Sequence, residues 1–241
     1  MNLSERLIVA ADFDPRKVGG LVGVRNKVLT LANELKGLGV IIKVNSFLRA
    51  YGYELIDVLH QLELKVFADL KLIDIPATME IDAAMLLDHK PDFLTVMCCA
   101  GIDGMNAVQK TLPNTKVLGV TVLTSLNEEE CQAIFTCSTK AGVLRFARMA
   151  KLAGLGELIL SPKEVDVVKD RFELQLGLNT PGIRPVWSLV EGDDQSRVLT
   201  PEQAIRNGAE RIVIGRPITQ AKNPREAVEK TLGEIQKGFA D

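Results

Sequence analysis

The stretch KVFADLKLIDIPAT, residues 65–78, places an apolar run typical of a buried β-strand just before the start of a helix. The run Lys65–Leu70 is largely apolar, and Pro76 is a residue typical of the first position of a helix. A strand that passes directly into a helix is the βα unit from which parallel sheets are built. The segment therefore predicts an α/β fold wherever the same unit recurs along the chain.

Seven further apolar runs, each followed by a stretch with helical periodicity, repeat this unit. Eight units in 241 residues correspond to about 30 residues each, the size of one βα repeat. The sequence therefore predicts a (β/α)8 TIM barrel that forms a single domain over residues 1–241. The expected strands are Arg6–Asp12, Val40–Asn45, Lys65–Leu70, Phe93–Cys98, Lys116–Leu123, Glu157–Ser161, Leu174–Asn179 and Arg211–Arg216.

A doubly wound open sheet is the alternative architecture. Such a sheet usually has fewer strands and a glycine-rich first turn. The first turn here, Ala11–Asp14, contains no glycine, and the chain has no GxGxxG motif. The barrel is therefore favoured. Helix starts support the division into units, because Thr200-Pro201-Glu202-Gln203 and Asn223-Pro224-Arg225-Glu226 each combine a capping residue, a proline and an acid or amide at the third position.

The overall composition excludes several functional classes. Lys and Arg total 29 and Asp and Glu total 31, for a net charge of −2, so no basic surface for nucleic acid is expected. No apolar run approaches the roughly 18 residues of a transmembrane helix, so no membrane association is expected. The start of the chain lacks the features of a secretory signal, and its four cysteines form no CxxC pair. A cytoplasmic location is therefore expected.

The chain contains only two histidines, His60 and His89, and both lie in helical-looking stretches. They are interpreted as ordinary helix or surface residues rather than catalytic bases. No cluster of histidines and cysteines has the spacing of a zinc site, so no metal is expected. Any catalysis must therefore depend on Asp, Glu, Lys, Arg and backbone groups.

Charged residues gather where the second and third strands end. Asp69 and Lys71 are two positions apart and share one face of a strand, which we expect to point into the barrel together with Phe67. Lys43 in the neighbouring strand is within reach, and Asp74 follows in the loop. Active sites of barrels lie at the carboxyl ends of the strands. Burying a charge is costly unless a partner neutralises it, so a cluster of charges is unusual at the end of a barrel strand. Four charges of alternating sign at this end therefore predict a functional site.

Each of these residues alone also has a purely structural interpretation. Lys43 is compatible with a strand edge, and Asp74 is compatible with a helix N-cap. Asp69 and Lys71 are compatible with a salt bridge at the barrel rim.

A second group of residues, after the seventh and eighth strands, is suited to binding an anion. The segment Thr180–Leu199 is long enough for a lid or binding loop, and Gly215-Arg216 ends the eighth strand where barrels often hold phosphate. The sequence therefore predicts a small phosphorylated substrate.

Five motifs in order resemble the orotidine 5′-phosphate decarboxylase family. Residues 69–78, DLKLIDIPAT, resemble its DLKxxDIPNT signature, and the resemblance extends from Asp12 to the last helix. Ala77 stands where the signature has Asn, and Cys98-Cys99 replaces a segment that usually carries His. The other four motifs are GVTVLTS (119–125), TPGIRP (180–185), DDQSRVLTPEQAI (193–205) and VIGRPIT (213–219).

The resemblance implies a role for each matching residue. It implies a catalytic charged network of Lys43, Asp69, Lys71 and Asp74, with Lys71 as the proton donor. It further implies a homodimer in which Asp74 and Thr78 reach into the site of the partner subunit, and a reaction without metal or organic cofactor. The residues implied in substrate binding are Asp12, Thr78, Thr124, Ser125, Arg184, Gln195, Gly215 and Arg216, of which Thr124 or Ser125 would contact the pyrimidine.

Two other interpretations remain open from the sequence. One is a related phosphate-binding barrel, such as a hexulose-phosphate synthase or sugar-phosphate decarboxylase, which shares the D-x-K-x-x-D core but uses Mg²⁺. The continuation Ile75–Thr78 and the DDQ segment at 193–195 argue against it. The other is a catalytically silent nucleotide-binding protein, against which the complete set of charged residues argues.

Overall fold

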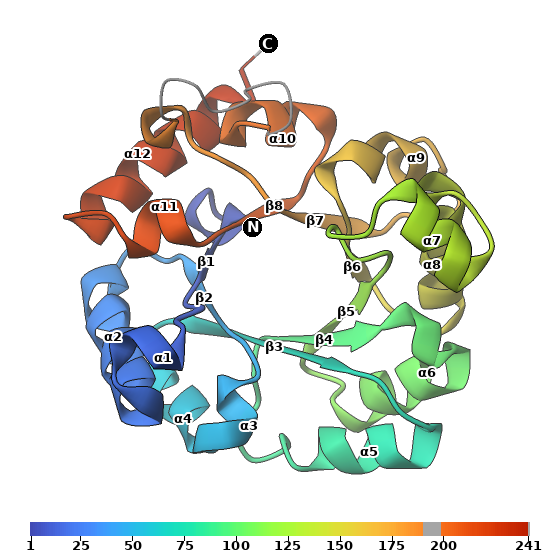
Figure 1. The fold of residues 1–241 in the computed structure, drawn as a ribbon, viewed down its shortest axis with the longest axis horizontal. Helices are drawn as coiled ribbons and strands as arrows, with labels where there is room; N and C mark the ends of the chain where they lie inside the picture. Colours follow the sequence, from blue (N-terminus) through green and yellow to red (C-terminus); the bar gives the residue numbers. More distant parts are fainter. Residues whose placement is uncertain (190–198, 241) are drawn as a thin grey trace.

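Eight parallel strands close into a barrel in the order β1 to β8 in the computed structural model, which describes residues 1–189 and 199–240 (Figure 1). Every neighbouring pair is parallel, and β1 pairs with β8 to close the ring. The predicted (β/α)8 barrel is confirmed. The strands are β1 Leu7–Ala10, β2 Ile41–Val44, β3 Lys65–Leu72, β4 Phe93–Met97, β5 Lys116–Val120, β6 Glu157–Ile159, β7 Gly177–Pro181 and β8 Arg211–Ile214.

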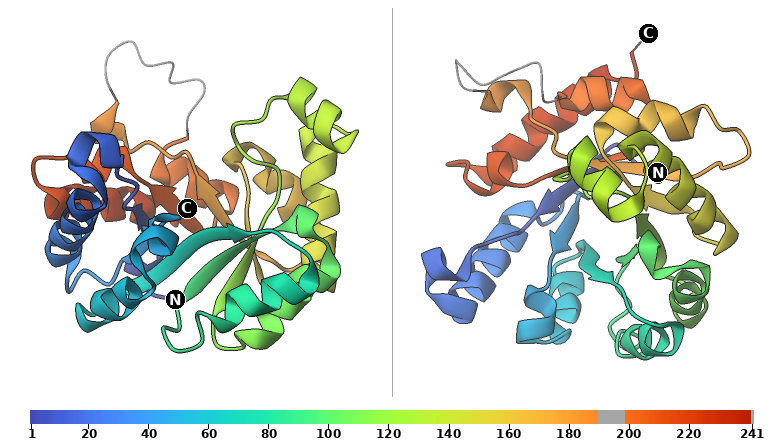
Figure 2. Two further views of the ribbon diagram at one scale, coloured as in Figure 1. Left: turned by 60° about the horizontal axis from the view of Figure 1, so that its bottom comes forward. Right: turned by 45° about the vertical axis from the view of Figure 1, so that its right-hand side comes forward.

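The helices surround the strands on the outside of the barrel, as the views in Figures 1 and 2 show. None of those among residues 1–189 and 199–240 is both long and apolar enough to cross a membrane. The α-helices are α1 Pro15–Val18, α2 Gly20–Leu35, α3 Phe47–Tyr51, α4 Glu54–Gln61, α5 Pro76–Ala84, α6 Ile102–Thr111, α7 Glu128–Phe135, α8 Thr139–Leu152, α9 Val165–Lys169, α10 Pro201–Asn207, α11 Arg216–Thr219 and α12 Pro224–Lys237. Short 3₁₀ turns lie at Ser4–Arg6, Cys98–Ala100, Pro162–Glu164 and Val186–Ser188.

The seventh strand begins later than its apolar run predicts. The sequence indicated Leu174–Asn179, whereas β7 spans Gly177–Pro181. Gln175 adopts the left-handed conformation with φ of 46°, so the chain turns there before it joins β6. Leu174 is nevertheless buried, which explains why its hydrophobicity resembled that of a strand residue. The third strand, in contrast, continues to Leu72, beyond the predicted end at Leu70.

The capping motifs form as predicted. The side chain of Thr200 accepts a hydrogen bond from the backbone N–H of Gln203, and the side-chain oxygen of Gln203 accepts one from the backbone N–H of Thr200. Asn223 caps α12 in a similar way through the N–H of Glu226. Each cap satisfies backbone donors that the first turn of a helix leaves free, so the local sequence determines where these helices begin.

Two apolar layers follow from the alternation of side chains along the strands. One set of residues packs between the strands and the helices, and includes Leu7, Val9 and Ile42. The other fills the barrel interior and consists of Ile8, Ala10, Ile41, Phe67, Phe93, Leu118 and Val213. The interior is therefore a packed core, and the space available for a ligand lies above it, at the carboxyl ends of the strands.

A buried ionic cluster lies below this interior layer. Arg211, the first residue of β8, donates to Glu157 of β6 at 2.7 Å, and Asn179 donates to the same carboxylate at 3.1 Å. Lys116 donates to the other oxygen of Glu157 at 2.8 Å. The guanidinium of Arg211 also lies 5.0 Å from the centre of the Phe93 ring. Since Arg211 and Glu157 are only 3% and 6% exposed, each depends on the other for charge compensation.

We therefore expect Glu157→Leu to lower the free energy of unfolding by about 3 kcal/mol, measured by urea denaturation. The variant leaves Arg211 buried, and Glu210, its remaining charged partner at 3.2 Å, is one-third exposed. Lys230→Gln is the control, because the Lys230–Glu226 pair is exposed and should contribute less than about 1 kcal/mol. A loss in Glu157→Leu no larger than in this control would contradict the role assigned to the cluster.

Candidate active site

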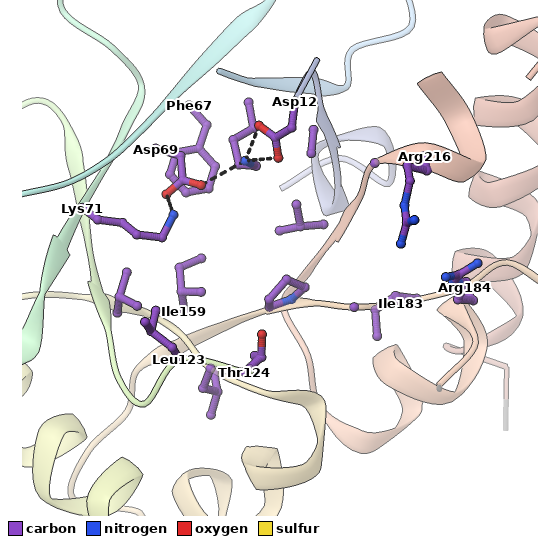
Figure 3. Close-up of a pocket in the computed structure, with 18 of the residues that line it drawn as sticks. Asp12, Phe67, Asp69, Lys71, Leu123, Thr124, Ile159, Ile183, Arg184 and Arg216 are labelled. Carbon is purple, nitrogen blue, oxygen red and sulfur yellow. Dashed lines mark hydrogen bonds and ion pairs between the residues drawn. The ribbon is translucent and has the colours of Figure 1, made fainter. Parts of the chain in front are cut away.

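A cavity of about 610 Å³ opens at the carboxyl ends of the strands. Residues at the ends of β1, β2, β3, β5, β6, β7 and β8 contribute to its walls. This volume is in the range of small-molecule sites. Its polar side chains are divided between two ends, as Figure 3 shows, with Lys71 and Asp69 at one and two arginines at the other. The polar and charged residues that line it are Asp12, Lys43, Asp69, Lys71, Thr124, Arg184 and Arg216.

An unbroken chain of alternating charges crosses one end of the cavity. The ammonium of Lys43 donates to both oxygens of Asp12, at 3.0 and 2.8 Å, and to Oδ2 of Asp69 at 2.9 Å. The ammonium of Lys71 donates to the other oxygen of Asp69, Oδ1, at 2.6 Å. The order is therefore Asp12–Lys43–Asp69–Lys71, with Lys71 as the end that faces the open cavity, 41% exposed.

The ionic state of the two central residues follows from burial and attraction. Burial alone would lower the pKa of Lys43 and raise the pKa of Asp69, because a low dielectric disfavours charge. The attraction of Asp69 and Asp12 outweighs burial and raises the pKa of Lys43 above its ordinary 10.5. Likewise, Lys43 and Lys71 together hold the pKa of Asp69 below 3.8. Both groups therefore stay charged at neutral pH.

Simple strand alternation does not describe how Asp69 and Lys71 come together. Ala68 pairs with Leu94 and Leu72 pairs with Val96, so the segment 69–71 of β3 lies opposite a single residue of β4. Lys71 has φ of 49°, in the left-handed region, which costs a residue other than glycine about 1–2 kcal/mol. Strain of this kind is concentrated at functional sites in proteins. The two side chains therefore meet through a bulge rather than through a regular strand.

Asp74 does not join the charged array within one chain, so the expectation that four residues including Asp74 converge there is wrong for the single subunit. The chain turns away after β3 ends at Leu72, and the exposed Asp74 accepts a hydrogen bond from the N–H of Ile75 at 2.7 Å. Asp12 takes the fourth place instead. Thr78 in α5 also lies outside the cavity wall.

The opposite end of the cavity carries the candidate anion-binding groups. Arg184, Gly215 and Arg216 all line it, and Gly182 has φ of 79°, a conformation that favours glycine. Arg184 and Arg216 also border a shallow extension of the cavity, with Gln220 beside them. The predicted Gln195 lies outside the residues that the structure describes, as does much of the predicted loop Thr180–Leu199.

Thr124 and Ser125 differ in position. Thr124 lines the cavity, whereas Ser125 is exposed and does not contribute to its wall. Apart from Phe67, the sequence did not identify the apolar part of the wall, which includes Val120, Val122 and Ile159, because buried strand residues resemble any other core. The sequence analysis also missed Thr95 in β4. A hydroxyl residue within an otherwise apolar strand could have indicated that this position has a polar partner.

Fold and site together define a (β/α)8 barrel with a charged pocket at the location where barrel enzymes have their active sites. Residues 5–231 match the model of the family described as "Orotidine 5'-phosphate decarboxylase / HUMPS family". The chain belongs to this family, and the predicted resemblance is confirmed.

Named relatives cover almost the whole chain. The orotidine 5′-phosphate decarboxylase of Syntrophus aciditrophicus is 37% identical over 98% of this chain and 95% of its own length. That of Syntrophomonas wolfei is 34% identical over 98% of this chain and 100% of its own. Among solved structures, the orotidine 5′-phosphate decarboxylase from Lactobacillus acidophilus has a TM-score of 0.78 and 30% identity, covering 96% of this chain and 99% of that one.

The charged array predicts a dependence of stability on pH. Because the native pKa of Asp69 lies below 3.8, its contribution to stability is present above about pH 4 and is lost as the pH falls through the native value. The raised pKa of Lys43 gives the opposite sign, with stability lost as the pH rises above 10.5. Asp69→Asn should therefore reduce proton uptake on unfolding between roughly pH 3 and 5, by up to about one proton.

Urea unfolding at several pH values measures this uptake as the slope of the free energy of unfolding against pH. Asp88→Asn, at an exposed position outside the cavity, is the control and should keep the wild-type slope. An unchanged slope in Asp69→Asn would show that Asp69 is not held ionised by its lysine partners.

Proposed function

We propose that the protein decarboxylates orotidine 5′-phosphate to uridine 5′-phosphate and carbon dioxide, as a step of pyrimidine biosynthesis that needs no metal or organic cofactor. Membership of the family and the names of its relatives support this activity. The observation that carries the proposal is the arrangement of the cavity. The chain Asp12–Lys43–Asp69–Lys71 crosses one end, and Arg184 and Arg216 stand at the other, as a substrate with a reacting ring and a remote phosphate requires.

In this proposal Lys71 performs the central chemical step. The bond between the pyrimidine ring and its carboxylate breaks, carbon dioxide leaves, and the electron pair stays on the ring carbon. The ammonium of Lys71 stabilises this carbanion and then donates a proton to it. The contact with Asp69 at 2.6 Å supports the role, because it holds the ammonium in one direction within the cavity.

The neighbouring charges hold Lys71 in position. Lys43, which is only 6% exposed, neutralises Asp69 and links it to Asp12. The carboxylate of Asp69 lies beside the ammonium that would face the departing carboxylate, so we place it next to the reacting group. Asp12 is 44% exposed and is placed to accept hydrogen bonds from the ribose hydroxyls.

Phosphate binding is assigned to the opposite end of the cavity. Arg216 offers a planar guanidinium suited to bidentate contact with phosphate, and Gly215 beside it also lines the cavity. We assign Arg184 and Gln195 to the same group, and Thr124 or Ser125 to the pyrimidine; Thr124 is the one in the cavity wall. Binding energy gained at this remote phosphate can lower the barrier at the ring by positioning the reacting carbon and excluding water from it.

A homodimer with shared sites is the second part of the proposal. Asp74 lies at the start of an exposed apolar surface that runs from the β3–α5 connection along α5. Apolar side chains this exposed and this close together are typical of a protein interface. In the dimer, Asp74 and Thr78 would enter the cavity of the partner subunit. The large apolar residues of this surface are Ile73, Ile75, Ile81 and Met85, each 57–66% exposed.

Absorbance during incubation with orotidine 5′-phosphate tests the activity, and Lys71→Ala tests the assignment of the proton donor. We expect Lys71→Ala to lower kcat by about 10³-fold or more while uridine 5′-phosphate still binds. Arg216→Ala is the matched control at the other end of the cavity. It should raise KM roughly 10- to 100-fold, because a charge-assisted contact with phosphate is lost.

Normal turnover by Lys71→Ala would contradict the proposed role of the lysine. Absence of turnover in the wild-type protein, with intact nucleotide binding, would instead favour the catalytically silent alternative. Loss of activity on addition of a chelator would favour the Mg²⁺-dependent barrels.

Mixing two inactive variants tests whether the site is shared between subunits. A dimer of one Lys71→Ala and one Asp74→Ala subunit has one site with both substitutions and one site with neither, if Asp74 acts across the interface. Random exchange should therefore restore about one quarter of the wild-type activity. As a control, Lys71→Ala mixed with Asp69→Asn should recover nothing, since both residues belong to the same chain's site. Absence of recovery in the first mixture would contradict the shared site.

A further inference from the structure

Thr95, in the middle of β4, is a buried hydroxyl residue directly behind the charged array. It is 1% exposed and does not line the cavity, so it makes no contact with a ligand there. Its neighbours in the strand, Leu94 and Val96, are fully buried apolar residues. A hydroxyl at such a depth is unfavourable unless it is hydrogen-bonded, so its partners indicate what it does.

Both hydrogen-bonding capacities of the Thr95 hydroxyl are directed at the charged array. The hydroxyl donates to Oδ1 of Asp69 at 2.9 Å. It accepts from the backbone N–H of Lys71 at 3.0 Å. Since the side chain of Lys71 donates to the same Oδ1 of Asp69, the three residues form a closed ring of hydrogen bonds. One hydroxyl therefore links the backbone of Lys71 to the carboxylate that aims its ammonium.

The ring lies where the pairing of β3 and β4 is interrupted. Thr95 is the single residue of β4 opposite the bulged segment 69–71, between the regular pairs Ala68–Leu94 and Leu72–Val96. A bulge leaves backbone groups without their usual partner in the neighbouring strand. The Thr95 hydroxyl provides a hydrogen-bond partner for the backbone N–H of Lys71. Because a lysine does not favour a φ of 49°, this backbone conformation depends on such contacts with the surrounding residues.

The hydrogen bond also completes the environment of Asp69. Oδ2 of this carboxylate faces Lys43 from β2, and Oδ1 faces Lys71 from β3 and Thr95 from β4. Asp12, just after β1, is the remaining charged group, and it acts through Lys43. Without the Thr95 hydroxyl, Oδ1 would keep only the Lys71 ammonium, which is carried on a long side chain with four rotatable bonds.

We propose that Thr95 is a positioning residue for the decarboxylation, whose hydroxyl holds the bulged backbone of Lys71 and the carboxylate of Asp69 in one arrangement. The inference rests on the proposed function, since it assigns a task to a residue behind the same site. A hydroxyl is required, because only a group that both donates and accepts closes the ring. The methyl group of Thr95 is not required.

Three variants separate the hydroxyl from the packing around it. Thr95→Val keeps the shape and removes the hydroxyl, whereas Thr95→Ser keeps the hydroxyl and removes the methyl group. Thr115→Val is the matched control: Thr115 is 5% exposed, and its hydroxyl donates to the backbone oxygen of Pro91 at 2.8 Å, outside the cavity wall. We expect Thr95→Val to lower kcat 10- to 100-fold, Thr95→Ser to stay within about threefold of wild type, and Thr115→Val to leave kcat unchanged.

Two further measurements distinguish positioning from a general loss of structure. The dissociation constant of uridine 5′-phosphate should stay within about twofold in Thr95→Val, because ribose and phosphate contacts are untouched. Loss of a donor disfavours the carboxylate form, so the pKa of Asp69 should rise in Thr95→Val but not in Thr95→Ser. This titration is followed by ¹³C NMR of the Asp69 carboxyl, assigned through its absence in Asp69→Asn.

The inference would be overturned if Thr95→Val kept kcat within twofold of wild type, if Thr95→Ser were as slow as Thr95→Val, or if Thr115→Val were equally slow. A wild-type protein that does not decarboxylate orotidine 5′-phosphate would refute the proposed function instead. In that case the Asp69 titration alone decides whether the Thr95 hydroxyl holds the carboxylate, and an unchanged pKa in Thr95→Val would refute this role as well.

Discussion

The buried ammonium of Lys43 is the constraint on which the site depends. It is surrounded by the inner face of the barrel and is only 6% exposed, so it remains charged only because Asp12 and Asp69 both contact it. Asp12 follows β1 and Asp69 belongs to β3, the two strands on either side of β2. The need to neutralise one buried cation therefore ties β1, β2 and β3 together at their carboxyl ends and leaves Asp69 with one oxygen free for Lys71.

The barrel interior separates two charged regions that have different tasks. Below it, Arg211 and Glu157 form a buried pair that does not line the cavity at the other end. Above it, the array containing Lys71 opens into a cavity of about 610 Å³. Phe67 and the other apolar residues of the barrel interior form a packed layer between the two regions. Similar ion pairs thus serve stability at one end of the strands and, in the proposed function, chemistry at the other.

Much of the fold and part of the site were predictable from local sequence. The eight βα units follow from hydrophobic periodicity, and the starts of α10 and α12 follow from their capping residues. The placement of Lys43, Asp69 and Lys71 at one end of the barrel follows from their positions late in two neighbouring strands, although the bulge through which Asp69 and Lys71 meet does not. The start of β7 was not predictable from apolar content, because a left-handed residue at Gln175 decided it. The position of Asp74 within the single subunit was not predictable, since a loop residue after a strand has no periodicity that indicates where it points.

The sequence by itself determined that the chain forms a barrel and that charged residues follow its second and third strands, because strand alternation and helix capping act between residues near each other in the chain. Only the tertiary structure decided that Asp12 is the second partner of Lys43, and that Thr95 faces the bulge that carries Lys71. Those contacts depend on the register between strands and on one left-handed backbone angle. Neither is encoded in the spacing of residues along a single strand, because both arise where separate strands meet.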